Sequence, residues 1–289
     1  MNYSIIFAGH NKTVLEYLSR RTDVDVIHCF FHMRQIERDA EAVALCEVYG
    51  LPYSVVSNNK NIVETLRSLK RADLGICAGF EILSQEVFKW PKRGFINIHP
   101  SYLPTYRGAH PFYYMFMHNE KKGGVSLHQV VKDVDAGRIY ARARFPILCE
   151  DDGASLARKA NDLAVALLKK YLIRIVQGEV RGIENRGGSY FPPVIGRQYI
   201  HTNMSALEIY NLVRSQTLYG GCLLEIDGRV VCIQRAMLGW RKKDARETDR
   251  ILGGEKVIRL RYENNIEVVL EVAESAELKF CRADGESKL

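Results

Sequence analysis

Asn97 and His99 are the residues of this sequence whose types and spacing best suit chemistry. They stand two apart at the end of an apolar run, so in a strand their side chains point to the same face. Pro100 follows directly and ends regular strand pairing. An amide and an imidazole therefore face one spot at a strand end, and Asp135 supplies a carboxylate further along the chain.

These three side-chain types can stabilise a developing oxyanion and move a proton. Fixed donors, such as an amide and an imidazole N–H, stabilise the oxyanion of a tetrahedral intermediate. An imidazole–carboxylate pair accepts and relays a proton near neutral pH, and no metal is required. For a lone Asn or His, a loop cap or a core histidine is the commoner explanation. Only the joint arrangement favours catalysis.

Strands and helices alternate along the first part of the chain. We expect strands over residues 3–8, 25–31, 52–57 and 74–78, and helices over 12–21, 34–49 and 62–69. This pattern predicts a Rossmann-like, mostly parallel α/β sheet with its active site beyond the carboxyl ends of the strands. The sequence has no GxGxxG motif and no GxxxxGK motif, so neither a nicotinamide dinucleotide nor ATP is indicated.

The rest of the chain predicts a long helix, a linker and a β-rich domain. The helix covers residues 155–175, and the linker over 182–193 is rich in glycine and proline. We place a catalytic domain at 1–189 and a small OB-like domain at 190–289, which in such folds holds substrate or a partner. Its expected elements are a helix over 205–215, strands over 221–226, 229–234, 256–262 and 265–272, and a turn at Asp227-Gly228.

Composition sets broad limits on the protein. A chain of 289 residues with 47% hydrophobic and 26% charged residues is typical of a soluble folded protein. The net charge of +7 fits a phosphate-bearing substrate or RNA about equally. Seven cysteines without a CxxC pair indicate a reducing compartment. The sequence shows no leader and no spanning segment, so we expect a cytoplasmic protein with no membrane partner; the oligomeric state stays open, a homodimer being one alternative.

The region around Asn97 resembles the folate-dependent formyltransferase family. The family pattern combines an Asn-x-His pair, a Leu-Pro run after a Ser, a basic-Gly turn and, further on, an Asp followed by a small residue and Gly. Here the pattern is met by Asn97, His99, Ser101, Leu103-Pro104, Arg107-Gly108 and Asp135-Ala136-Gly137, with the strand Gly124–His128 before the Asp. The resemblance covers roughly residues 1–185 in layout and 94–140 in motif.

The resemblance implies an enzyme that uses 10-formyltetrahydrofolate as formyl donor. Asn97, His99 and Asp135 then become the catalytic residues, with Asp135 orienting His99 and raising its basicity. The folate would be held by Phe80, Ile82, Leu83 and Asp135. The substrate would be contacted by Ser101, Tyr106, Arg107 and Gly108.

Three acceptors of the formyl group remain open: methionyl-tRNA, a nucleotide-linked amino sugar, and a small metabolite such as glycinamide ribonucleotide. The tRNA enzymes carry a basic, Gly-rich loop where residues 31–40 of this chain hold two basic and two acidic residues, and binding a polyanion needs unopposed cations. We therefore expect no nucleic-acid partner.

We favour a UDP- or dTDP-linked 4-amino-deoxy sugar for bacterial surface glycans, as in the amino-arabinose and pseudaminic-acid types. Arg197 and Tyr199, where the tRNA type differs in sequence, are candidate substrate contacts.

Two other functions use the same fold. A formyltetrahydrofolate hydrolase would apply the three residues to water, but such enzymes usually bear an added N-terminal domain. A non-catalytic folate-binding module would be expected to lack part of the Asn/His/Asp set. Four other histidines, His28, His110, His118 and His128, are read as surface, supporting or strand residues. No spacing among the eight histidines fits a metal site.

Overall fold

The chain is described by a computed structural model over residues 2–201, 203–226, 228–240, 257–262 and 266–273. Two compact units divide it. The first comprises residues 1–111, 122–146 and 157–191, and the second comprises 112–121, 147–156 and the residues from 192 onward. The boundary expected at 189/190 stays a prediction.

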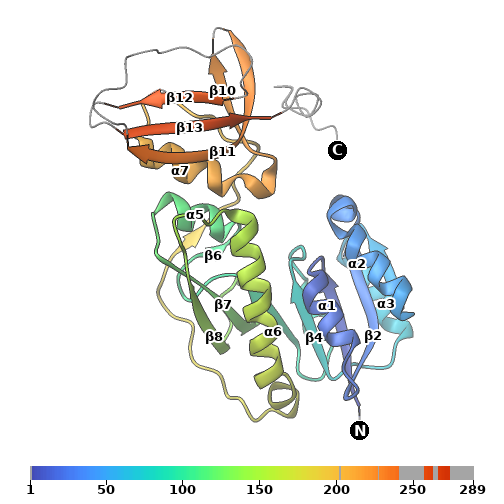
Figure 1. Cartoon of the computed structure of the whole chain (residues 1–289). Coiled ribbons are helices and arrows are strands. Elements are labelled where there is room, and N and C mark those ends of the chain that lie inside the picture. Colours follow the sequence, from blue (N-terminus) through green and yellow to red (C-terminus); the bar gives the residue numbers. More distant parts are fainter. Residues whose placement is uncertain (1, 202, 227, 241–256, 263–265, 274–289) are drawn as a thin grey trace. The chain divides into compact units, whose positions relative to one another are not determined.

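The first unit contains a seven-stranded sheet in the order β3-β2-β1-β4-β5-β7-β8 (Figure 1). The first five of these strands in sequence pair in parallel, and β7 and β8 add antiparallel strands at one edge. The expected Rossmann-like, mostly parallel sheet is therefore confirmed. The strands are β1 (Tyr3–Gly9), β2 (Val24–His32), β3 (Tyr53–Val56), β4 (Leu74–Ala78), β5 (Phe95–His99), β7 (Lys122–Gln129) and β8 (Ile139–Pro146).

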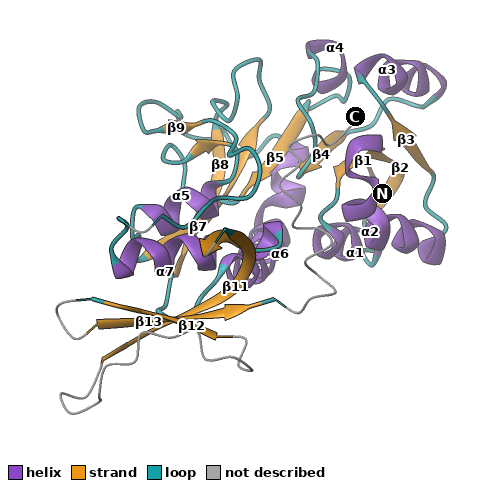
Figure 2. Cartoon of the chain, turned by 90° about the horizontal axis from the view of Figure 1, so that it is seen from above, coloured by secondary structure: helices purple, strands orange, loops and turns teal. Residues whose placement is uncertain are grey.

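Helices cover both faces of this sheet. Figure 2 shows α3 and α4 on one face and α1, α2 and α6 on the other. The helices are α1 (Lys12–Ser19), α2 (Ile36–Tyr49), α3 (Asn59–Ser68), α4 (Gln85–Phe88), α5 (Pro111–Met117) and α6 (Gly153–Gln177), with a 3₁₀ turn over Met33–Gln35. Gly50 ends α2 in the left-handed conformation, which a glycine adopts without the cost of a β-carbon. Both α5 and α6 contain residues of each unit.

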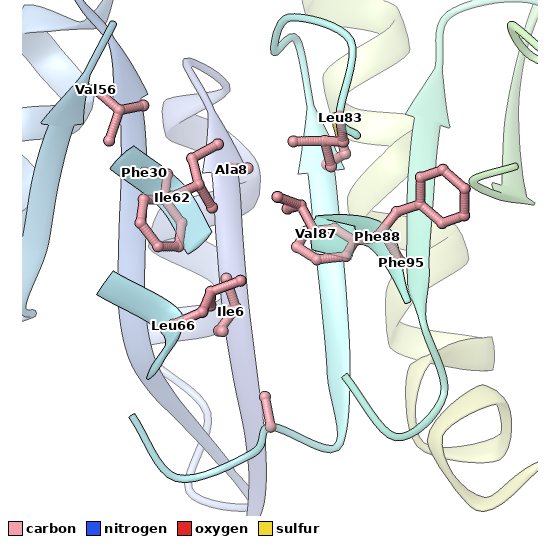
Figure 3. Close-up of a cluster of buried hydrophobic side chains, with 12 residues drawn as sticks. Ile6, Ala8, Phe30, Val56, Ile62, Leu66, Leu83, Val87, Phe88 and Phe95 are labelled. Carbon is pink, nitrogen blue, oxygen red and sulfur yellow. The ribbon is translucent and has the colours of Figure 1, made fainter. Parts of the chain in front are cut away.

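The core of the sheet has the alternation that a strand buried on both faces requires. Ile6 and Ala8 of β1 lie in a cluster with Ile62 and Leu66 of α3, and Phe95 of β5 joins it (Figure 3). Ile5 and Phe7, the intervening residues of β1, are also fully buried, and period two places them on the opposite face.

The second unit is an antiparallel sheet with one helix. The sheet order is β10-β11-β13-β12, and α7 packs against β11 and β13. The elements are α7 (Ala206–Ser215), β10 (Cys222–Ile226), β11 (Arg229–Trp240), β12 (Val257–Arg261) and β13 (Ile266–Val272), with a 3₁₀ turn over Thr217–Tyr219. The β-rich unit is as expected, while its OB-like character stays a prediction. Asp227, Lys256 and Asn265, which bounded predicted elements, lie outside the described residues.

Candidate active site

The ends of β5 and β7 bring the predicted residues together. Asn97 on β5 pairs in register with His128 on β7, and His99 pairs with Ser126. Asp135 lies in the loop that connects β7 to β8. This antiparallel pairing places polar side chains of two strands beside a single carboxylate.

The carboxylate of Asp135 is surrounded by four groups of the first unit. Its Oδ1 accepts a hydrogen bond from the Asn97 Nδ2 at 3.2 Å, and its Oδ2 accepts one from the Gly108 backbone N–H at 2.9 Å. The Nδ1 of His99 lies 3.5 Å from Oδ2, and the Nε2 of His128 lies 3.3 Å from Oδ1. The Asp135 side chain is 9% exposed, so these contacts are made away from bulk water.

The acceptors around the two imidazoles assign their tautomers. The Nε2 of His99 lies 2.7 Å from the Tyr106 carbonyl oxygen, which can only accept, so Nε2 carries hydrogen and Nδ1 is the basic atom of the neutral ring. By the same reasoning the Nδ1 of His128 donates to the Gln129 carbonyl at 2.9 Å, and its Nε2 accepts from the Asn97 Nδ2 at 3.2 Å. Two unprotonated ring nitrogens therefore face one carboxylate, and the cluster can take up a proton.

The electrostatics keep Asp135 ionised and His99 neutral. Burial alone would raise the pKa of Asp135, but the protonated forms of His99 and His128, together with the Gly108 N–H, favour the anion and hold this pKa well below its ordinary value. Burial also lowers the pKa of His99 below its ordinary 6.5, because Asp135 and the Tyr106 carbonyl offset the cost of a buried cation only in part. Near neutral pH His99 is available as a base.

The loop after β5 holds the remaining residues expected near the substrate. Ser101 is fully buried, and its hydroxyl donates to the Thr105 carbonyl at 2.8 Å, so it shapes the loop. The ring of Tyr106 stacks on Phe191 with centroids 5.4 Å apart. Arg107 and Gly108 form β6 (Arg107–Gly108), which pairs in parallel with β9 (Tyr190–Phe191). Their predicted substrate contacts stay predictions.

Arg107 is the cation closest in sequence to this cluster. Its Nε is buried and has no hydrogen-bond partner among the described residues. Gly108 beside it has a φ of 95°, and a β-carbon there would collide with the Phe191 carbonyl. A glycine is therefore required for the Gly108 N–H to reach Asp135.

The segment expected to hold the folate follows β4, and its three side chains differ in exposure. Ile82 is 71% exposed, Phe80 is half-buried with its ring edge-on to His32, and Leu83 is 6% exposed within the core cluster. Asn59 of α3 fixes this segment, because its side-chain amide donates to the Ile82 carbonyl at 3.0 Å and accepts from the Ser84 N–H at 2.8 Å. Phe80 and Ile82 can offer an apolar wall, whereas Leu83 packs inward.

Arg197 and Tyr199, the other predicted substrate contacts, belong to the second unit. The Arg197 Nη1 lies 3.9 Å from the Cys232 Sγ, and Tyr199 forms a parallel bridge with Leu223 of β10. Both are tied to the β10–β11 part of that unit. Their role toward a substrate stays a prediction.

Two residues of the cluster were missed at the level of sequence. His128 was read as an ordinary strand residue, although its place two residues after Ser126 at the end of a strand before Asp135 was a usable signal. Asn185 donates to the backbone of the Asp135 loop from within the glycine-rich linker, where no pattern marked it.

The described ranges contain neither a metal-binding cluster nor a membrane-spanning helix. In this part of the chain no group of three or more His, Cys, Asp or Glu side chains is arranged to hold a metal ion. Over the same residues no helix is both long and apolar enough to cross a bilayer.

The comparison with known families classifies the chain. The profile of the family described as Formyl transferase matches residues 25–172, which is about half of the 289 residues. The match contains Asn97, His99, His128 and Asp135. The chain belongs to the formyl transferase family.

Curated relatives match the same part of the chain. A methionyl-tRNA formyltransferase of Sulfurihydrogenibium sp. is 34% identical over 164 residues, covering 55% of this chain and 52% of the relative. The bifunctional polymyxin resistance protein ArnA of Wigglesworthia glossinidia brevipalpis is 33% identical over 163 residues, covering 55% of this chain and 25% of that protein. Against the methionyl-tRNA formyltransferases, the chain spans about half the length of the relatives it matches.

Solved structures match nearly the whole chain in fold. The N-formyltransferase of Helicobacter canadensis, solved with folinic acid and dTDP-3-aminofucose, has a TM-score of 0.70 at 18% identity and covers 94% of this chain and 100% of its own. HypX of Aquifex aeolicus has a TM-score of 0.69 at 16% identity and covers 96% of this chain and 50% of its own. At these identities the similarity is one of fold.

Proposed function

We propose that the chain transfers a formyl group from 10-formyltetrahydrofolate to the amino group of a UDP- or dTDP-linked 4-amino-deoxy sugar. The observation that carries this proposal is the buried Asp135 carboxylate, which contacts the Asn97 amide and faces basic nitrogens of two imidazoles. Family membership supports the reaction type, since the family profile spans all four residues.

The donor supplies a formyl carbon bonded to a nitrogen that leaves as an amine. Attack by the substrate amine forms a C–N bond and places the carbonyl electrons on oxygen. Collapse breaks the bond to the folate nitrogen, which takes the electron pair and a proton. The substrate nitrogen loses one proton, so the products are a formamide and tetrahydrofolate.

The cluster provides the proton movements that this reaction needs. The His99 Nδ1 accepts the proton of the attacking amine, and Asp135 Oδ2 at 3.5 Å stabilises the resulting imidazolium. The Asn97 Nδ2 donates to the developing oxyanion by exchanging one of its two 3.2 Å contacts within the cluster. Burial of the site strengthens both interactions.

The folate is assigned to the segment after β4. A flat heteroaromatic ring needs apolar walls with a few backbone donors and acceptors. The exposed Ile82 and the half-buried Phe80 meet the first requirement, and the loop backbone, held by Asn59, meets the second. Leu83 contributes from the core side.

The acceptor is assigned from two observations. The fold similarity to a dTDP-sugar-bound N-formyltransferase covers 94% of this chain, whereas the methionyl-tRNA formyltransferase match is confined to 55% of it. Residues 31–40 also lack the basic excess that tRNA requires: Arg34 and Glu37 are both exposed, and Asp39 is buried against the His32 N–H. Because the chain is 34% identical over 164 residues to a methionyl-tRNA formyltransferase, methionyl-tRNA is the second candidate for the acceptor.

A single assay separates the candidates. The protein is incubated with 10-formyltetrahydrofolate and, in parallel, UDP- and dTDP-linked amino sugars, charged initiator tRNA, or buffer alone, and the folate absorbance is followed. Turnover with an amino sugar and a mass gain of one formyl group on the sugar are expected. Turnover with tRNA alone would move the assignment to the tRNA enzyme, and turnover in buffer would identify a hydrolase.

A further inference from the structure

Residues 183–191, which we call the strap, contact both loops of the candidate site. Ile183 exchanges two backbone hydrogen bonds with Ile139 at the start of β8. At the other end, β9 pairs with β6 beside the Asp135 carboxylate. The strap therefore runs from the loop that carries Asp135 to the loop that carries Gly108, all within the first unit.

Asn185 ties the strap to the first of these loops. Asn185 is 8% exposed, and its Nδ2 donates to the Asp135 carbonyl at 2.6 Å and to the Gly137 carbonyl at 3.0 Å. One amide group thus bridges the two carbonyls on either side of Ala136. No other side chain of the described residues is seen to bond these two carbonyls.

Ser189 ties the strap to the second loop. Its Oγ accepts the Tyr106 N–H at 2.9 Å, and its carbonyl accepts the Arg107 N–H at 2.9 Å. The Tyr106 carbonyl in turn accepts the hydrogen of the His99 Nε2. Ser189 therefore acts on His99 through the backbone of Tyr106.

The two residues held in this way have backbone conformations that are uncommon for residues other than glycine. Asp135 has a φ of 50° and Tyr106 a φ of 59°; Asp tolerates this left-handed region better than most residues, whereas Tyr rarely adopts it. Such conformations persist where surrounding contacts enforce them. In both loops the strap provides the enforcing hydrogen bonds.

We propose that Asn185 and Ser189 are positioning residues that hold the Asp135 carboxylate and the His99 imidazole at their working separation. This proposal rests on the proposed function, because the separation between Asp135 and His99 affects catalysis only if the two residues take part in formyl transfer. Asn185 sets the direction of the carboxylate through the backbone at 135–137, and Ser189 sets the ring of His99 through Tyr106. Neither residue touches the reacting atoms.

The test compares Asn185→Ala and Ser189→Ala with Arg186→Gln. Arg186 neighbours Asn185, is exposed and pairs with Glu184, so its change leaves both loop contacts intact. The measurements are the melting temperature, kcat and KM for folate and amine, and the pKa of His99 by NMR titration of the protein without substrates. Asn185→Ala is also placed in an Asp135→Asn background.

We expect Asn185→Ala to lower kcat about 10- to 100-fold, the size typical of a misplaced catalytic group, with KM little changed. The His99 pKa should fall further, because the anion that favours its protonation moves away while His128 and the Tyr106 carbonyl remain. In the Asp135→Asn background the same change should have almost no effect on kcat. Ser189→Ala should also lower kcat, whereas Arg186→Gln should behave as wild type.

An unchanged His99 pKa in Asn185→Ala, or an equal loss of kcat with and without the Asp135 carboxylate, would overturn the positioning role. If Asn185→Ala does not fold, Ser189→Ala and its double variant with Asp135→Asn decide by the same criteria. A wild-type protein that formylates none of the amines would refute the proposed function. The NMR titration would still decide whether the strap positions Asp135 against His99.

Discussion

Asn97 and His128 lie opposite each other in register on β5 and β7, with the Asn97 Nδ2 at 3.2 Å from the His128 Nε2. The same Nδ2 donates to Asp135 at 3.2 Å, so one amide joins an imidazole to a carboxylate. His128 is 2% exposed on its side chain and therefore acts inside the cluster. This relationship predicts a supporting role for His128 beside the three residues expected from the motif.

Replacing His128 by Ala should lower kcat about 10- to 100-fold, a smaller loss than removal of a catalytic group, since His128 orders Asn97 and Asp135. Steady-state kinetics with both substrates measures this. The matched control is His28→Ala, because His28 also lies on a strand and bonds only Ser54 among the contacts described. A His128→Ala enzyme as active as the control would remove His128 from the site.

Asp135→Asn should lower turnover by about 100- to 10,000-fold, because the neutral amide cannot stabilise the protonated His99. Folding should change little, since an Asn side chain has the same size and can still accept the Gly108 N–H. Asp133→Asn, two residues earlier and exposed, is the control. If Asp135→Asn kept more than a tenth of wild-type turnover with an unchanged melting curve, the catalytic assignment would be wrong.

The arrangement of Asn97 and His99 could be predicted because it depends on local rules. A two-residue spacing in a strand puts both side chains on one face, and a parallel sheet gathers its functional groups at the carboxyl ends. The parallel sheet could also be predicted, because the alternation of β1 to β4 with their helices is visible in the local sequence pattern. These features are encoded in short stretches of sequence, which a single chain reveals.

The contacts of His128 and Asn185 depend on distant segments instead. His128 reaches Asn97 through antiparallel pairing between β5 and β7, across 31 residues of chain. Asn185 meets Asp135 across 50 residues of chain. β11 likewise continues to Trp240 because β13 pairs with it from Ile233 to Trp240, whereas the sequence favoured an end at Gln234. Tertiary pairing of this kind leaves no periodic signal.

Activity should fall on the acid side with a midpoint below pH 6.5. Burial lowers the His99 pKa from its ordinary 6.5, so the neutral base persists to lower pH than in a free imidazole. The same shift contributes stability that is fully present above pH 6.5 and is lost as pH falls toward the folded-state pKa. The pH profile of kcat/KM and the melting temperature of wild type and His99→Asn measure both effects. An acid limb centred above pH 6.5 would contradict this account.

Ile82→Asp and Leu83→Asp should separate folate binding from folding. Ile82 is 71% exposed, so its carboxylate stays hydrated in the free protein and the melting temperature should hold. A folate ring laid against it would bury an unpaired charge, so affinity should fall about 10- to 100-fold. Leu83 is 6% exposed among Val87, Phe88 and their neighbours, and its Asp variant should lower the melting temperature by roughly 10 °C or more.

Calorimetry with folate and with the sugar nucleotide, on each variant, checks the distinction. Ile82→Asp should retain the nucleotide affinity of wild type while losing folate affinity, and Ile82→Leu serves as its control because it keeps the apolar surface. Leu83→Asp should lose both affinities together with stability. Equal loss of both ligands in Ile82→Asp, accompanied by a lower melting temperature, would show that this segment only packs and would place the folate elsewhere in the first unit.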